Sequence, residues 1–206
     1  MRTIKDPEVR RSEILDAAER LFGAKGFEKA TVIDILDAAG IAKGTFYYYF
    51  KSKEEVLDAL IDKRVTEGVK KAEEIAASAL PVMVKFISAV MAQKPQNKIQ
   101  KEFNARLHET DNSKIHLKSL TQYILRLSPC LGKLVEEGNK SGLFSAQFPK
   151  ESAEILLSAA IVLFDDDFFQ WTKKETKAKI AAFLMAAERI LGARPGTFSE
   201  FGRVFS

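Results

Sequence analysis

Hydrophobic residues recur at intervals of three and four positions along most of the chain, which is the spacing of one buried helix face. No segment alternates apolar and polar residues with a period of two, so the pattern predicts an all-α fold. With proline, glycine and capping residues as boundaries, we expect helices from Pro7 to Gly26, Thr31 to Gly40, Lys43 to Phe50, Ser52 to about Ala79, Pro81 to Pro95, Ile99 to His108, Lys114 to Lys140, Pro149 to Trp171 and Thr172 to Gly192.

The segment from Thr31 to Lys53 organises the first part of the chain, and it reads TVIDILDAAGIAKGTFYYYFKSK. Thr31 is expected to cap a helix that Gly40 ends, because glycine enters the left-handed backbone region easily. A second short helix follows, and Ser52 with Glu55 is expected to form a capping box for the next one. Two short helices joined by a glycine turn predict a helix-turn-helix unit, whose second helix enters the major groove of DNA.

The second of these helices has two different faces when its residues are placed about 100° apart. Phe46 and Phe50 fall on the inward face, which packs on the first helix. The other residues suit contacts with DNA: Gly44, Thr45 and Tyr48 point outward, and Tyr47 and Tyr49 lie on the flanks. Small, hydroxyl and phenol groups fit base edges and phosphates. The alternative is an aromatic core helix, which would have to find buried partners for three tyrosine hydroxyls.

Positive charge is concentrated in the same segment. Between Ile41 and Lys53 there is no carboxylate, whereas there are three lysines: Lys43, Lys51 and Lys53. The whole chain has a formal net charge of only +4. We therefore expect Lys43, Lys53 and Thr31 to contact phosphates, and Arg11 on the first helix to reach a phosphate or the minor groove.

These motifs resemble the DNA-binding domain of the TetR/AcrR family of transcriptional regulators. The similarity covers about Arg10 to Leu57 and is carried by ILDAAERLFGAKGFEKAT and DILDAAGIAKGTFYYYFKSKEEVL. Two residues depart from the family pattern: Ala30, where a second threonine often stands, and Ala42, where a serine often caps the recognition helix. The resemblance implies a homodimer that binds double-stranded DNA at a palindromic operator, with a dimer surface and an effector pocket in its C-terminal domain.

The composition fits one or two globular domains, since the 206 residues are 46% hydrophobic and 29% charged. Cys130 is the one cysteine, which excludes an internal disulfide and suits a reducing cytoplasm; we expect it to be buried rather than to act as a redox sensor. No apolar run reaches the ~18 residues of a membrane span, and the N-terminus has no signal-peptide core. We therefore expect a cytoplasmic protein without a membrane partner.

Groups that carry catalysis do not form a recognisable set. His108 begins a segment that resembles a zinc-protease motif, but Asn112 stands where the second histidine ligand belongs. The sequence contains no phosphate-binding GxxxxGK or GxGxxG motif and no evident cysteine–histidine nucleophile pair. We expect no enzyme activity, no metal and no cofactor.

Three adjacent carboxylates, Asp165 to Asp167, are the one unusual cluster. On a helix they would point about 100° apart, so they could not bind one metal from one face. We expect them to be solvated, with one paired to a basic residue. The alternative is that one carboxylate points into a cavity.

The sequence predicts a division into two domains, a DNA-binding domain over residues 1–53 and a helical effector-binding and dimerisation domain over residues 54–206. The last two long helices combine many alanines with large apolar residues, including Leu156, Phe183 and Leu184. Small residues let helices approach closely, so we expect a four-helix interface across a two-fold axis. The alternative is an ordinary core within one chain.

An aromatic stripe in the second domain predicts an effector pocket. Ile161, Phe164, Phe168 and Trp171 repeat at helical spacing in the helix expected after Pro149, and Pro129 should kink a long neighbouring helix and leave space. The expected lining is Phe86, Phe103, Tyr123, Phe164, Phe168 and Trp171. Such a lining favours a small hydrophobic effector, neutral or cationic. The alternative is that the stripe is plain core.

Together these features predict a ligand-responsive DNA-binding regulator, and we favour a repressor that a small hydrophobic effector releases from its operator. One alternative is a DNA-binding regulator that a protein partner controls without an effector. A second is a small-molecule carrier or enzyme with a vestigial DNA-binding head, although Thr45, Tyr47, Tyr48 and Lys53 are all retained.

Overall fold

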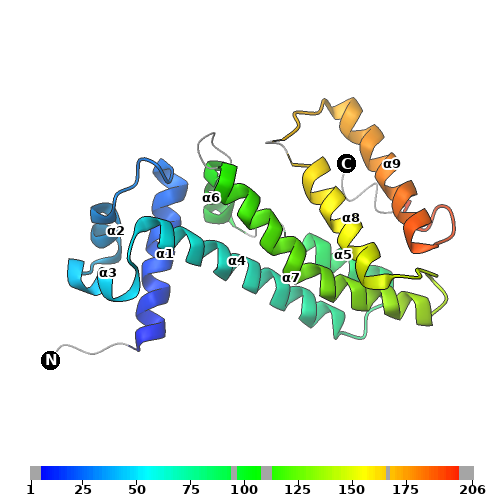
Figure 1. Cartoon of the computed structure of the whole chain (residues 1–206), viewed down its shortest axis with the longest axis horizontal. Helices are drawn as coiled ribbons and strands as arrows, with labels where there is room; N and C mark the ends of the chain where they lie inside the picture. The colour runs from blue at the N-terminus through cyan, green and yellow to red at the C-terminus, as the bar shows by residue number, and fades with distance from the viewer. Residues whose placement is uncertain (1–5, 94–96, 108–112, 166–167, 200–206) are drawn as a thin grey trace. The chain divides into compact units, whose positions relative to one another are not determined.

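The computed structural model describes residues 6–93, 97–107, 113–165 and 168–199. In these ranges every regular element is a helix, which confirms the predicted all-α fold. The helices are α1 (Pro7–Lys25), α2 (Val32–Ala39), α3 (Lys43–Tyr49), α4 (Lys53–Ala76), α5 (Val82–Met91), α6 (Lys98–Leu107), α7 (Ser113–Lys140), α8 (Pro149–Leu163) and α9 (Lys173–Leu191) (Figure 1). No helix in the described part of the chain has the length and apolar character needed to cross a membrane.

Packing divides the chain into two compact units. The first comprises residues 1–66 and 94–119, and the second comprises residues 67–93 and 120–206. Helix α4 therefore begins in the first unit and ends in the second. The division at residue 53 that we expected from chain order stays a prediction.

The first unit is built around α1, which contacts α2 and α6. Its core contains Phe22, Phe46, Phe50 and Leu57, all almost fully buried. A Cβ atom on Gly23 would lie 3.2 Å from the backbone nitrogen of Phe103, so the glycine permits the close approach of α6 to α1.

Two ion pairs join α1 to α4 within this unit. The Lys63 ammonium lies 2.7 Å from the Asp16 carboxylate, and Arg64 pairs with Glu19. Glu19 is buried, so losing its arginine would leave a charge without compensation. These pairs fix α1 against the first half of α4.

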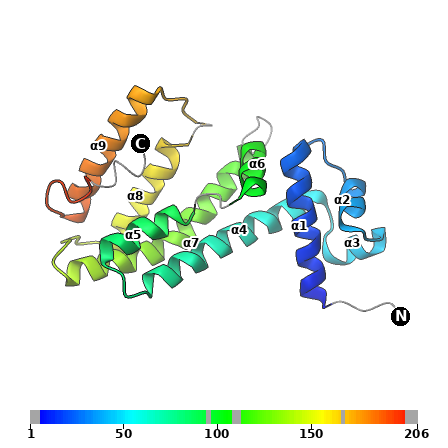
Figure 2. The same cartoon turned by 180° about the vertical axis from the view of Figure 1, so that it is seen from behind.

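The second unit has its own apolar core. The buried side chains come mainly from α7, α8 and α9: Leu127, Leu131, Leu134, Val135, Leu156, Leu157 and Leu191. Helices α8 and α9 pack side by side, as the views in Figures 1 and 2 both show. Lys85 is buried on α5 and donates to both carboxylate oxygens of Glu137 on α7, at 2.9 and 3.0 Å.

Helix α8 is shorter than we predicted, because it ends at Leu163 rather than continuing to Trp171. The run of aspartates begins two residues later, where the negative end of the helix dipole disfavours carboxylates and aspartate is a poor helix former. The backbone N–H of the C-cap residue Phe164 still donates to Ala160. The aromatic stripe from Ile161 to Trp171 is therefore not one helix face, and that prediction was wrong.

Candidate DNA-binding surface

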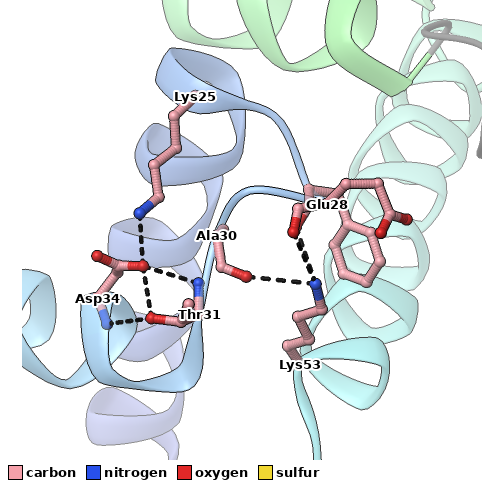
Figure 3. Close-up of polar contacts among 7 residues, drawn as sticks. Lys25, Glu28, Ala30, Thr31, Asp34 and Lys53 are labelled. Carbon is pink, nitrogen blue, oxygen red and sulfur yellow. Dashed lines mark hydrogen bonds and ion pairs between the residues drawn. The ribbon is translucent and has the colours of Figure 1, made fainter.

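The surface begins with the N-terminus of α2, which is capped as the sequence predicts. The Thr31 hydroxyl oxygen accepts a hydrogen bond from the Asp34 backbone N–H at 3.2 Å, and the Thr31 N–H donates to the Asp34 carboxylate at 2.8 Å. The Thr31 hydroxyl also donates to that carboxylate, at 2.6 Å (Figure 3). The hydrogen-bonding groups of Thr31 therefore have partners inside the protein before any phosphate arrives.

Lys25 at the end of α1 completes this cap. Its ammonium lies 2.5 Å from the Asp34 carboxylate. The bond from Lys25, followed by those from the Thr31 side chain and backbone, lowers the pKa of Asp34 to about 2. We did not single out Lys25 or Asp34 from the sequence, although Thr31 followed three residues later by an acidic residue is a capping-box pattern.

A left-handed glycine joins the two short helices. Gly40 has φ 62° and ψ 43°, and its N–H donates back to Asp37 at 3.3 Å. The N–H of Ile41 donates to the Leu36 carbonyl at 3.0 Å, so the turn closes the end of α2 in the manner of a Schellman motif. This geometry sets the direction in which α3 starts.

Helix α3 has the two faces that the sequence predicts. Phe46 and Phe50 are completely or almost completely buried, whereas Tyr48 is 75% exposed and Tyr47 is 49% exposed. Gly44 on the outward face has open space where a side chain would begin. Ala42 at the N-cap position makes no side-chain cap bond, as expected for its departure from the family pattern.

Contacts between aromatic rings and neighbouring groups hold the side chains around α3. The Tyr48 and Tyr49 rings meet edge to face at 4.9 Å between centroids. The Lys43 ammonium lies 6.0 Å from the Tyr47 ring centroid, and the Arg11 guanidinium lies 5.2 Å from that of Phe50. The structure thus brings Arg11 of α1 to the end of α3, and Thr45 is half-buried on α3 itself.

The first turn of α4 differs in detail from the expected capping box. The Ser52 hydroxyl oxygen accepts from the Glu55 N–H at 3.3 Å, as predicted. The Glu55 carboxylate, however, accepts from the N–H of Lys51 at 2.6 Å. The Ser52 hydroxyl also lowers the pKa of Glu54. These bonds fix the α3–α4 connection beside the exposed tyrosines.

Lys53 has partners other than the phosphate that we expected. Its ammonium donates to the carbonyl oxygens of Phe27, Glu28 and Ala30 at 3.1, 3.3 and 3.3 Å (Figure 3). It also lies 4.4 Å from the centroid of the Phe27 ring. Phosphate binding by Lys53 stays a prediction, and it would compete with these three carbonyl contacts.

The residues expected to line an effector pocket belong to both compact units, and the expected lining stays a prediction. Phe103 belongs to the first unit, where its backbone lies against Gly23, so it is not in the same unit as Phe86 and Tyr123. The physical reason is that α6 packs on α1, a long-range contact that periodicity does not report. Phe86 is half-buried against the core of the second unit, and Tyr123 is half-buried on α7.

The other aromatic candidates lie at the end of α8 and in the connection to α9. The Phe164 ring meets Phe183 of α9 edge to face, with 5.7 Å between centroids. Trp171 stacks on Phe169 at 4.8 Å and has the Lys179 ammonium 3.7 Å from its ring centroid. Phe168 is exposed. Of the three aspartates, only Asp165 lies among the described residues, and the predictions for Asp166 and Asp167 lie outside them. Cys130 is buried, as predicted, and burial raises the pKa of its thiol.

The fold and this surface define a helix-turn-helix protein whose recognition helix presents an exposed tyrosine face. Residues 14–60 match the bacterial regulatory proteins of the tetR family, and residues 95–186 match the tetracyclin repressor-like C-terminal domain. The chain belongs to the TetR family of transcriptional regulators.

Similar proteins fall into two groups by coverage. The transcriptional repressor KstR2 of Rhodococcus jostii is 44% identical over 71 residues, which are 34% of this chain and 35% of KstR2. The chain thus matches only about a third of the length of this relative. The uncharacterized regulator YhgD of Bacillus subtilis is 26% identical over 169 residues, which are 80% of this chain and 85% of YhgD. The structure of Salmonella enterica GusR shares the fold, with a TM-score of 0.63 and 20% sequence identity. The match covers 92% of this chain and 99% of the GusR chain.

Proposed function

We propose that this chain is a homodimeric transcriptional repressor that binds a palindromic DNA operator and is released by a small hydrophobic effector. The observation that carries the proposal is the outward face of α3, where Tyr48 and Tyr47 are exposed beside the open position at Gly44. A short helix with a smooth, partly aromatic face and no carboxylate suits the floor of a major groove. The name of KstR2, a repressor, supports repression over activation.

Within this proposal, Thr45 and Tyr48 read bases, and Lys43, Tyr47, Tyr49 and Arg11 contact the backbone. Gly44 lets the helix approach the base edges. The exposure of Lys43, Tyr47 and Tyr48, the partial exposure of Thr45, Tyr49 and Arg11, and the absence of negative charge on α3 support the assignment. Thr31 is a phosphate contact only if its hydroxyl leaves the Asp34 carboxylate, or if its N-terminal turn contributes through the helix dipole.

The homodimer rests on α8 and α9, where large apolar side chains are exposed on the isolated chain: Ile155, Val162, Met185 and Ile190. Exposed apolar side chains on neighbouring helices favour a protein–protein contact. A two-fold dimer would present two recognition helices to the two halves of a palindrome. Cytoplasmic location follows from the same role, since the DNA lies there.

The effector site is proposed within the second unit alone. Its aromatic candidates are Phe86, Tyr123 and Phe164, which are half-buried, with Trp171 in the α8–α9 connection. These groups favour a hydrophobic ligand that is neutral or cationic rather than phosphorylated. Coupling then requires the ligand to bind better to the DNA-free state than to the DNA-bound state.

Selection of a binding sequence from random duplex DNA tests the proposal directly. The parent chain should enrich one palindrome, and the Tyr48→Ala variant should bind it about tenfold or more weakly, because a base contact is worth on the order of 1–3 kcal/mol. Phe148→Ala is the matched control, since Phe148 is an exposed aromatic residue of the second unit, and it should bind like the parent. Parent protein that enriches no sequence would contradict the proposal.

The same operator complex tests the effector. Neutral hydrophobic compounds should release the DNA and raise the melting temperature of the free protein. A compound at a hundred times its dissociation constant should increase the free energy of unfolding by about 2.7 kcal/mol. Phe164→Ala should weaken this response. Release by a protein partner alone, with no response to any small compound, would favour the regulator without an effector.

A further inference from the structure

Lys53 occupies an unusual position for a lysine. It is the first residue of α4, where the positive end of the helix dipole disfavours a cation. Its ammonium reaches the connection between α1 and α2, where it donates to three backbone carbonyls, those of Phe27, Glu28 and Ala30 (Figure 3). An ammonium has three N–H donors, so these carbonyls account for all of its hydrogen-bonding capacity.

The three carbonyls belong to the connection between α1 and α2. This connection is tight, because the Ala30 N–H donates to the Phe27 carbonyl at 3.2 Å. Ala30 is buried and directly precedes Thr31, the cap of α2. The Phe27 carbonyl accepts from both the Ala30 N–H and the Lys53 ammonium, and the carbonyls of Glu28 and Ala30 accept from the same ammonium. Carbonyl oxygens that converge on one point are stabilised by a donor between them.

We propose that Lys53 is a positioning residue, which ties the α1–α2 connection to the first turn of α4 and so places the N-terminus of α2 and the recognition helix that follows it. In this role it does not act as a phosphate ligand. The inference rests on the proposed DNA-binding function. Within that function, Lys53 contributes to DNA binding indirectly, because it holds the geometry of the helix-turn-helix unit instead of contacting a phosphate.

The two roles differ in their dependence on salt. A lysine that neutralises a phosphate releases a counterion, so its loss reduces the slope of log K against log salt by about 0.9. A lysine that positions the recognition helix changes the affinity for DNA, but it leaves the number of phosphate contacts, and hence the slope, unchanged. The roles also differ toward arginine, which binds phosphate well but has a planar fork that does not fit three converging carbonyls.

The test compares Lys53→Met and Lys53→Arg with the parent full-length chain on the selected operator, at a temperature where circular dichroism shows every variant folded. Methionine keeps an unbranched side chain but removes the ammonium, which makes the three hydrogen bonds and lies over the Phe27 ring. Lys51→Met is the matched control, because Lys51 is an exposed lysine two residues earlier. Both Lys53 variants should bind about tenfold more weakly with the slope of the parent.

Amide hydrogen exchange supplies a readout that does not need DNA. Faster exchange from Ala30 to Ile35 in both Lys53 variants, but not in Lys51→Met, is expected if the lysine positions α2. A reduced salt slope in Lys53→Met together with parent-like binding by Lys53→Arg would overturn the proposal, as would unchanged exchange. If the parent itself selects no DNA, the proposed function fails, and the exchange comparison alone decides the role of Lys53.

Discussion

Hydrogen bonds that side chains make inside the protein decide which of them are available to DNA. The Thr31 hydroxyl donates a hydrogen bond to the Asp34 carboxylate, and the Lys53 ammonium donates to three backbone carbonyls. Tyr47 and Tyr48, in contrast, extend from α3 with large exposed surfaces. At the scale of single residues, we therefore propose a structural role for the corner between α1 and α2, and a sequence-reading role for the outward face of α3.

Asp34 makes the α2 cap sensitive to acid. The Lys25 and Thr31 contacts lower its pKa from the ordinary value of 3.8 to about 2 in the folded chain. The folded state therefore binds fewer protons between these values, and the carboxylate stabilises folding above about pH 4. This contribution is lost as the pH falls from about 4 to about 2. The melting temperature of Asp34→Asn should thus lie below that of the parent at pH 7 and approach it toward pH 2.

The control for this prediction is Asp37→Asn, which removes a carboxylate from the same helix outside the cap. Thermal melts of the three proteins at a series of pH values measure the difference. A gap between Asp34→Asn and the parent that stays constant from pH 7 to pH 2 would show that the Lys25 and Thr31 contacts do not hold this carboxylate.

At the scale of elements, boundaries set by neighbouring residues were predictable from the sequence. Thr31 and Thr172 each cap a helix, and Gly40 and Gly192 each end one, as predicted. Both caps are capping boxes, and both glycines are in the left-handed region. Such signals act within one turn, so periodicity and capping residues suffice to find them. The end of α8 was missed because its apolar spacing continues beyond Leu163, where the aspartate run ends the helix.

The outward face of α3 leads to a prediction at Gly44. A Cβ atom there would meet nothing within 4 Å, and the residue is not in the positive-φ region. Alanine should therefore stabilise the helix, by up to about 1 kcal/mol, because glycine is a poor helix former. The new methyl group would stand between α3 and the bases, so Gly44→Ala should bind the operator several-fold more weakly.

Gly142→Ala is a control with the opposite effect on stability and no expected effect on DNA binding. It also has open space for a Cβ atom, but its φ of 74° strains any other residue. It should lower the free energy of unfolding and leave DNA affinity unchanged. Urea denaturation and operator titration measure both quantities. Parent-like affinity in Gly44→Ala would mean that α3 does not approach the bases through this face.

At the scale of the whole molecule, the sequence predicted the DNA-binding head better than the rest. The helix-turn-helix depends on local turns and on two buried phenylalanines, Phe46 and Phe50, that periodicity identifies. The pocket lining depends instead on which distant helices meet. Phe103 was expected in the same lining as Phe86, and the structure assigns it to the first unit, where Gly23 lets α6 pack on α1. No local pattern contains that information.

Assembly is the remaining property that belongs to the whole molecule. On the single chain, Ile155 is 57% exposed and Val162 43% on α8, and Met185 is 50% exposed and Ile190 38% on α9. A two-fold interface would bury these side chains against their own copies. A glutamate near the axis would instead meet its copy without a counter-charge. We therefore expect Ile155→Glu and Met185→Glu to be folded monomers.

Sedimentation at micromolar concentration tests this expectation, since the parent should have twice the 23.0 kDa mass of the chain. Leu80→Glu is the control, because Leu80 is an exposed apolar residue in the α4–α5 connection, and it should remain a dimer. The monomers should also lose most of their affinity for a palindrome, as one head contacts only one half-site. Monomeric parent protein with full operator affinity would contradict the dimer, whereas dimeric Ile155→Glu and Met185→Glu would place the interface on a different surface.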